Sequence, residues 1–155
     1  MASTDSSSLV PGAYRLRAVS EKDPSSELYA TYHGLAEQIK VAEKSKHGQV
    51  WDVSLDVDGC INIRALGFID SIDTYLRNEK DGKVGLGPRQ LIRPLKQKET
   101  DGRTIYSLTA PASNPNVIDA SDWFGTSRGE VVTVSGGLNN PPVFLDSYLW
   151  YLQSL

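Results

Sequence analysis

Short runs of alternating apolar and polar residues dominate the chain. The runs are rich in Val, Ile, Leu, Tyr and Thr, and Gly, Pro, Asn and Asp separate them. Alternation with a period of two, bounded by turn-forming residues, is typical of β-strands with one buried face. No segment carries a sustained helical stripe, and the one helical turn that residues 71–77 allow is too short to change the class. The pattern therefore predicts an all-β protein.

One strand motif occurs three times at nearly equal intervals. It runs Tyr14–Val19, Ile61–Leu66 and Tyr106–Pro111, with apolar residues at the first and third positions and Ala at the fifth. In each repeat an aromatic residue marks a second strand, and third and fourth strands follow. The aromatics are Tyr29, Tyr75 and Trp123; the third strands are 38–42, 83–86 and 130–135; the fourth are 50–53, 91–95 and 149–152.

Four strands repeated three times predict a β-trefoil of twelve strands. In that fold a six-stranded barrel is capped by three hairpins, and the closed barrel removes exposed strand edges. We assign residues 10–155 to this single domain and expect the polar N-terminus, 1–9, to be disordered. A single β-sandwich is the alternative, but a sandwich needs no threefold register.

Turn chemistry supports the boundaries between these strands. Asp58-Gly59, Asp81-Gly82 and Asp101-Gly102 each lie between strand signals. Asp-Gly tolerates the positive φ angles that tight hairpins need. The first and third of these pairs connect the fourth strand of one repeat to the first strand of the next.

The inward-facing positions are bulky and apolar, so we expect a packed interior without a pocket. Function then falls to surface loops held by a rigid scaffold. The residues assigned to the interior are Tyr14, Leu16, Trp51, Ile61, Ile63, Ile92, Tyr106, Leu108 and Trp150.

Composition narrows the class of protein further. A chain of 155 residues with 39% hydrophobic and 23% charged residues is an ordinary soluble domain. The net charge of -3 offers no basic field for nucleic acid. No apolar run is long enough to cross a membrane. The Ser-rich start has no apolar core of a signal peptide, so we expect a cytoplasmic or unconventionally released protein.

Candidate ligand motifs are incomplete. His33 and His47 lie in different predicted loops without His or Cys at ligand spacing. Asp56–Gly59 resembles part of a calcium loop but lacks the further oxygen ligands, so a hairpin turn is the better interpretation. Gly85–Pro88 lacks the Lys-Ser/Thr of a phosphate loop. We expect no metal and no cofactor.

Candidate catalytic groups are equally sparse. No Gly-x-Ser-x-Gly elbow is present. Cys60 is the single cysteine and has no electropositive neighbour in sequence, so we predict a buried structural thiol. Asp70, Asp73, Asp119 and Asp122 are scattered carboxylates, and among 19 acidic residues some proximity is expected by chance. We therefore expect a protein that is not an enzyme.

Long loops rich in Pro, Asn and Ser are the more informative feature. They span 20–27, 43–48, 111–122 and 136–142. Prolines in such loops restrict the backbone and reduce the entropy lost on binding. The alternative is that these loops are tolerated insertions without a role.

The strand sequences resemble those of mushroom protease inhibitors of the clitocypin type, the mycocypins. The likeness covers roughly residues 9–111. It is carried by 11–19, 29–31, 41–43, 50–53, 58–59, 61–67, 88–95 and 105–111.

This resemblance implies a β-trefoil that inhibits proteases. In mycocypins, the first and second hairpin loops of repeat one, which join strand one to strand two and strand three to strand four, occlude a papain-like cleft. The matching loop residues here are Lys22, Asp23, Pro24 and Ser25, then Lys44, Ser45, Lys46 and His47. We expect a monomer that binds a papain-like protease, with no nucleic acid or membrane partner.

Two alternatives remain open. The stretch 34–37, and Pro141-Pro142 before Leu149-Trp150, resemble the cospin-type trypsin inhibitors. That resemblance implies a trypsin-like partner and a reactive site at Tyr32-His33, while Arg128-Gly129, flanked by small residues, offers a basic alternative. A glycan-binding lectin is the other alternative, with Asp122-Trp123 as a sugar site in repeat three.

Overall fold

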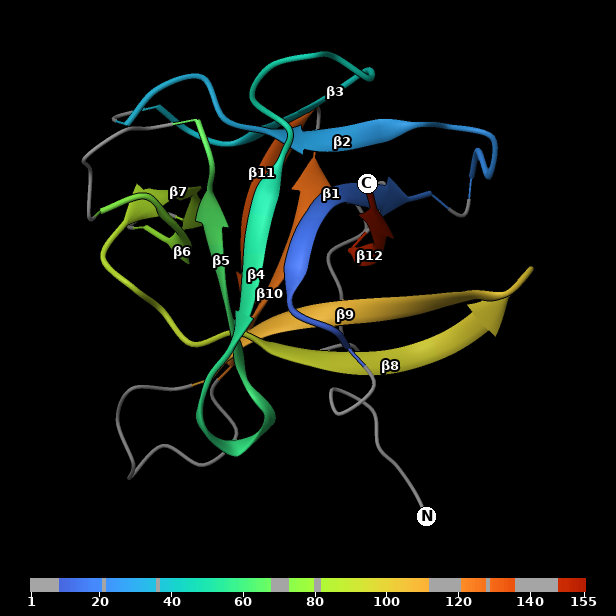
Figure 1. Ribbon diagram of the computed structural model, residues 1–155. Coiled ribbons are helices and arrows are strands. Elements are labelled where there is room, and N and C mark those ends of the chain that lie inside the picture. The colour runs from blue at the N-terminus through green and yellow to red at the C-terminus, as the bar shows by residue number, and fades with distance from the viewer. Residues whose placement is uncertain are drawn as a thin grey trace.

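The computed structural model describes residues 9–20, 22–35, 37–67, 73–79, 82–111, 121–127, 129–135 and 148–155 (Figure 1). Within these residues twelve strands follow one another in the order expected from the repeats. They are β1 (Gly12–Val19), β2 (Leu28–Thr31), β3 (Lys40–Ala42), β4 (Trp51–Leu55), β5 (Ile61–Ala65), β6 (Tyr75–Asn78), β7 (Val84–Gly87), β8 (Arg93–Thr100), β9 (Arg103–Pro111), β10 (Ser121–Ser127), β11 (Glu130–Ser135) and β12 (Leu149–Ser154).

Strand pairing repeats in three units. The first strand of each unit pairs with its fourth, in β1–β4 and β9–β12, and β5 meets the start of the β8 segment through an Ile61–Ile92 bridge. The fourth strand also pairs with the first strand of the next unit, in β4–β5, β8–β9 and β12–β1. The β12–β1 ladder additionally closes a seven-strand path through β9, β10, β11, β3 and β2.

The second and third strands of the three repeats form three hairpins. They are β2–β3, β6–β7 and β10–β11. The three hairpins meet one another close to β3, β7 and β11. The Ile39 amide donates to Val84 O at 2.8 Å, and the Val131 amide donates to Ile39 O at 3.0 Å. Lys83 and Val132 form a bridge that completes the triangle. The all-β prediction is confirmed, and this single closed sheet is consistent with a β-trefoil rather than with two stacked sheets.

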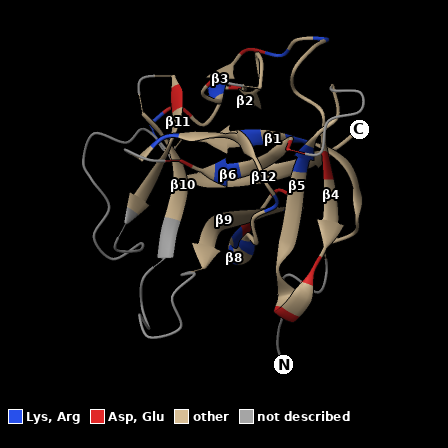
Figure 2. Ribbon diagram, turned by 90° about the vertical axis from the view of Figure 1, so that its left-hand side faces the viewer, with Lys and Arg blue, Asp and Glu red and all other residues tan. Residues whose placement is uncertain are grey.

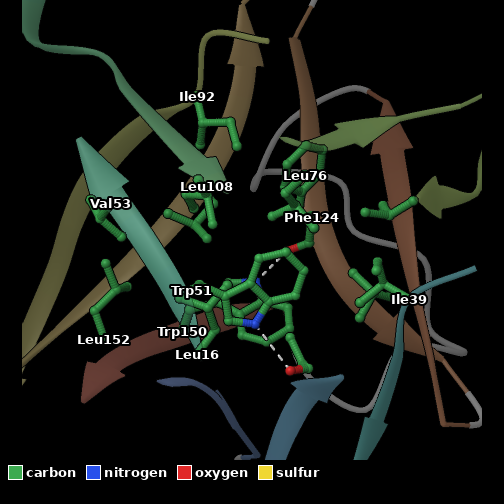
Figure 3. Packing of buried hydrophobic residues seen from close by; sticks show 14 of the residues in the cluster. Leu16, Ile39, Trp51, Val53, Leu76, Ile92, Leu108, Phe124, Trp150 and Leu152 are labelled. Atoms are coloured by element: carbon green, nitrogen blue, oxygen red, sulfur yellow. Dashed lines mark hydrogen bonds between the residues drawn. The ribbon is translucent and has the colours of Figure 1, made fainter. Parts of the chain in front are cut away.

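The core contains every residue assigned to it from the alternation pattern. Trp51, Ile61, Ile63 and Ile92 are fully buried, and the other five assigned residues expose at most 9% of their surface. Figure 3 shows both tryptophans within the same buried cluster, each with its indole N–H bonded to a backbone carbonyl.

Two of the predicted Asp-Gly turns have the expected backbone. Asp58 and Asp101 have φ angles of 53° and 54°, and the glycines that follow are also positive. Thr100 pairs directly with Arg103, so Asp101-Gly102 is a two-residue hairpin turn. The strand before it was underestimated: β8 runs to Thr100 instead of residue 95, with a bulge between Lys96 and Lys98. The β8–β9 hairpin consequently projects from the body of the molecule (Figure 1).

Cys60 is buried, as predicted, but its surroundings were not foreseen. The Arg93 guanidinium lies 3.8 Å from the Cys60 Sγ. Sequence neighbours alone therefore misjudged the charge beside the thiol, because Arg93 comes from a different strand segment. In the part of the chain that the structure describes, no three His, Cys, Asp or Glu side chains gather as a metal site. None of its helices is long and apolar enough to cross a membrane.

Several sequence-based candidates lie outside the described residues. These are residues 1–8, Asp70, Asp81, Asp119, Arg128, and most of the loops 111–122 and 136–142. The expected disorder of residues 1–9 is wrong for Leu9, which is buried in the hydrophobic core.

Candidate functional site

The first loop, residues 20–27, connects β1 to β2 and carries the exposed residues Lys22, Asp23, Pro24 and Ser25. Asp23 organises it: its carboxylate accepts the Ser25 hydroxyl at 2.6 Å and the Ser25 amide at 3.3 Å. The Asp23 amide donates to Ser20 Oγ at 3.1 Å. Such side-chain bonds to nearby backbone are typical of Asx turns. The first loop is thus folded on its own hydrogen bonds.

Arg17 fastens the end of this loop to β1. Its Nη2 donates to Ser26 O at 3.0 Å, and the Ser26 amide donates to Asp23 O at 3.0 Å. The loop is therefore tied to the barrel on the side away from its exposed tip.

The second loop, residues 43–50, connects β3 to β4 and exposes Lys44, Ser45, Lys46 and His47. A serine turn closes its tip: Ser45 Oγ donates to His47 O at 3.0 Å, and the His47 amide donates to Ser45 Oγ at 3.1 Å. All four predicted residues are therefore available to a partner.

Gln49 holds the second loop from beneath. Its side chain is fully buried. Its Oε1 accepts the Ser45 amide at 2.9 Å, while its Nε2 donates to Glu43 O at 2.7 Å and to Thr31 Oγ1 at 3.1 Å. One amide thus joins both sides of the loop to β2. A buried amide with these partners satisfied favours a single loop conformation.

Gly48 fixes the path by which the loop returns to the barrel. Its φ angle is +77°, and a Cβ at this position would lie 2.5 Å from Tyr32 O. Its own carbonyl accepts the Tyr32 amide at 2.8 Å. Only glycine combines this conformation with so close a backbone approach.

The two loops leave from the same end of the β2–β3 ladder. Tyr29 near the start of β2 pairs with Ala42 at the end of β3. The first loop therefore ends, and the second begins, beside this pair; in Figure 1 the first loop lies at the right and the second arches over the top. The structure brings together the two loops that the resemblance singled out.

Repeat three contributes to the same surface. A hollow of about 270 Å³ is lined by Lys22 and Asp23 of the first loop, by Val41, and by Gly129 of the β10–β11 turn. The Val41 amide donates to Gly129 O at 2.9 Å. The Gly129 candidate thus adjoins the first loop, although the two lie in different repeats.

Tyr32 does not have the exposure that a reactive site needs. Its ring is buried edge-on against Trp51, with centroids 5.0 Å apart, and its hydroxyl donates to Val50 O at 3.2 Å. Burial raises the pKa of Tyr32 above its ordinary value. The expectation that Tyr32-His33 enters a specificity pocket is therefore wrong for Tyr32, which packs in the core; His33 is exposed.

Charges of both signs are distributed over the molecule. Figure 2 shows basic positions on β1, β6 and β8 and acidic positions at the β4–β5 turn. The first loop likewise places Lys22 beside Asp23, and the second has Glu43 before Lys44. The two loops therefore carry charges of both signs rather than one strong field.

Fold and site together define a closed all-β scaffold that presents two loops held by their own hydrogen bonds. No protein-family model matches the chain. The chain is similar to Clitocypin-4/-3 of Clitocybe nebularis, with 29% identity over 120 residues, which cover 71% of this chain and 77% of the relative. This similarity confirms the resemblance to clitocypin-type proteins.

Proposed function

We propose that this protein is a β-trefoil that reversibly inhibits proteases by covering the active-site cleft with its first and second loops. A papain-like cysteine protease is the favoured target. The similarity to a clitocypin supports the class of function. The observation that carries the mechanism is the Tyr29–Ala42 pair, which sets both loops at one end of one hairpin.

Inhibition of this kind is steric and needs no covalent step. Two loops that flank one point can reach either side of a protease cleft and exclude substrate. A standard protease–inhibitor interface buries roughly 800 Å² on each partner. The internal bonds of Asp23 and Gln49 hold the loops before binding, which lowers the conformational entropy lost in the complex.

A trypsin-like serine protease is the second candidate target. Gly129 in the β10–β11 turn has a φ angle of +83°, and no atom lies within 4 Å of the position of a Cβ there. A protease backbone has room to approach this turn. Its neighbour Arg128 supplies the basic side chain that trypsin-like enzymes select.

A panel of papain, trypsin and an asparaginyl endopeptidase tests the proposal. Residual protease activity is measured against inhibitor concentration for the wild-type protein and for Arg128→Ala. Papain inhibition that Arg128→Ala leaves unchanged supports loop occlusion. Trypsin inhibition that this variant abolishes would move the site to repeat three. Absence of inhibition, with binding on a glycan array, would replace the proposal with a lectin.

A further inference from the structure

A second depression lies on the other side of the first loop, toward the β8–β9 hairpin. It has a volume of about 380 Å³, which is within the range of ligand sites. Residues of β1, the first loop, β8, β9 and β12 line it, among them Arg17, Pro24, Lys98, Arg103 and Tyr151. We call this depression the basic groove.

Three cationic side chains line the basic groove. Among the described residues, no carboxylate forms an ion pair with Arg17, Lys98 or Arg103. The groups are nevertheless held in place: Arg17 bonds Ser26 O, and the Arg103 guanidinium lies 5.1 Å from the centroid of the Tyr151 ring. Unpaired guanidinium groups bind carboxylates with paired, charge-assisted hydrogen bonds. In a chain of net charge -3, this local excess of positive charge is notable.

The groove also has apolar walls. Val19, Pro24, Ile105 and the Tyr151 ring lie among the cations. Asp101 at the hairpin tip is the one acidic residue among the described lining residues. A dense polyanion such as a sulfated glycan would gain nothing from the apolar walls. A peptide that alternates acidic and apolar side chains uses both features.

We propose that the basic groove binds an acidic peptide segment with interspersed apolar side chains, presented by the protein that the first loop engages. Ser20, Pro24 and Ser26 belong to the first loop and also line the groove. Any partner seated on that loop therefore brings its neighbouring surface to the groove. That the partner protein carrying this segment is a protease rests on the proposed function. The binding of the acidic peptide to the groove does not.

The direct test titrates the full chain with a capped tetrapeptide of three glutamates and one leucine, at low ionic strength. Amide chemical shifts locate the site and give the dissociation constant. A peptide with glutamines in place of the glutamates is the ligand control. The protein variants are Lys98→Gln with Arg103→Gln, and Lys96→Gln as the matched control on the same strand. Lys96 pairs with Glu99 at 2.9 Å and does not line the groove.

Saturable shifts at Ser20, Thr100 and Tyr151 are expected, with affinity about tenfold weaker in the double variant and unchanged in Lys96→Gln. The glutamine peptide should not bind. Absence of shifts at these amides would overturn the proposal. So would tighter binding of a heparin-derived tetrasaccharide, or an equal response to inorganic sulfate, at the same residues.

The protease panel separates this inference from the proposed function. A protein that binds the acidic peptide but inhibits no protease would overturn the proposed function and support the groove. A protein that inhibits papain but binds no acidic peptide would overturn the groove alone.

Discussion

Trp51 and Trp150 make the same hydrogen bond in two different repeats. Trp51 Nε1 donates to Ala30 O at 3.1 Å, and Trp150 Nε1 donates to Phe124 O at 2.8 Å. Each bond joins the fourth strand of a repeat to its second strand. In repeat two the equivalent position is Ile92, whose side chain has no N–H to donate and is fully buried. The three repeats thus bury a large apolar side chain at the same position, but only the two tryptophans also donate a hydrogen bond from it.

Replacing either tryptophan should therefore lower the free energy of unfolding by more than the loss of side-chain volume alone would. Trp51→Phe and Trp150→Phe keep an aromatic ring but leave a buried carbonyl without its donor, which costs about 1–3 kcal/mol. Ile92→Val, the control in repeat two, should cost about 0.5–1.5 kcal/mol. Urea unfolding followed by far-UV circular dichroism measures all three variants. Equal stability of Trp51→Phe and wild type would show that this bond contributes nothing.

Gln49 should decide whether the second loop is prefolded. Gln49→Leu keeps a similar shape but leaves the Ser45 amide and Glu43 O without their partner, and we expect a loss of about 1–3 kcal/mol. The Ser45 amide should then exchange its hydrogen faster in native-state measurements. Gln97→Leu, which makes the same chemical change on the exposed face of β8, should leave Ser45 protected. Unaltered exchange in Gln49→Leu would refute the anchoring role of Gln49.

Gly48 and Gly102 form a matched pair that separates backbone strain from steric clash. Their φ angles are +77° and +76°, but a Cβ at Gly48 would lie 2.5 Å from Tyr32 O, whereas nothing lies within 4 Å at Gly102. Gly102→Ala should therefore cost about 1–2 kcal/mol from the left-handed conformation alone. Gly48→Ala should lose clearly more free energy of unfolding. Similar losses in the two variants would contradict the close approach of Gly48 to Tyr32.

Stability at alkaline pH should depend on Tyr32. Burial raises the pKa of Tyr32 in the folded protein, while the unfolded phenol ionises near pH 10. Above pH 10 the unfolded state therefore binds fewer protons than the folded state. The contribution of the protonated Tyr32 to the free energy of unfolding is complete below pH 10 and is lost as the pH rises through the folded pKa. Urea midpoints from pH 8 to 11 should fall less steeply in Tyr32→Phe. Parallel curves would exclude this contribution.

The strand order and the core were predictable because their signals are local. Alternation identified Leu16, Ile63 and Leu108 as inward-facing, and the recurring Ala placed the three units in register. Asp101-Gly102 carried its turn type in two residues. The extension of β8 was missed because residues 96–100 are charged and exposed, and pairing with β9 rather than burial keeps them in a strand.

The candidate site was predictable only in part. The sequence indicated the exposed tips of both loops, since polar and proline-rich segments connect the strands. It could not indicate the roles of Gln49 and Arg17, because their bonds depend on contacts made after folding. It also placed Tyr32 in a reactive loop, although packing against Trp51 buries that ring. The proximity of Gly129 to the first loop could not be predicted, because it depends on the pairing of β3 with β11, which belong to different repeats.

The proposed mechanism requires the first and second loops to cover the protease cleft together. Lys22→Ala or His47→Ala alone should each weaken papain inhibition by about 1 kcal/mol or less, as most interface positions do. The decisive measurement is the papain inhibition constant after residues 22–25 and 44–47 are both replaced with Gly-Ser sequence. The fold should persist, checked by the melting temperature, because none of these side chains is buried. We expect the double replacement to weaken inhibition far more than either loop change alone. Inhibition at wild-type strength by this variant, or a wild-type protein that never inhibits papain, would contradict the loop-occlusion mechanism.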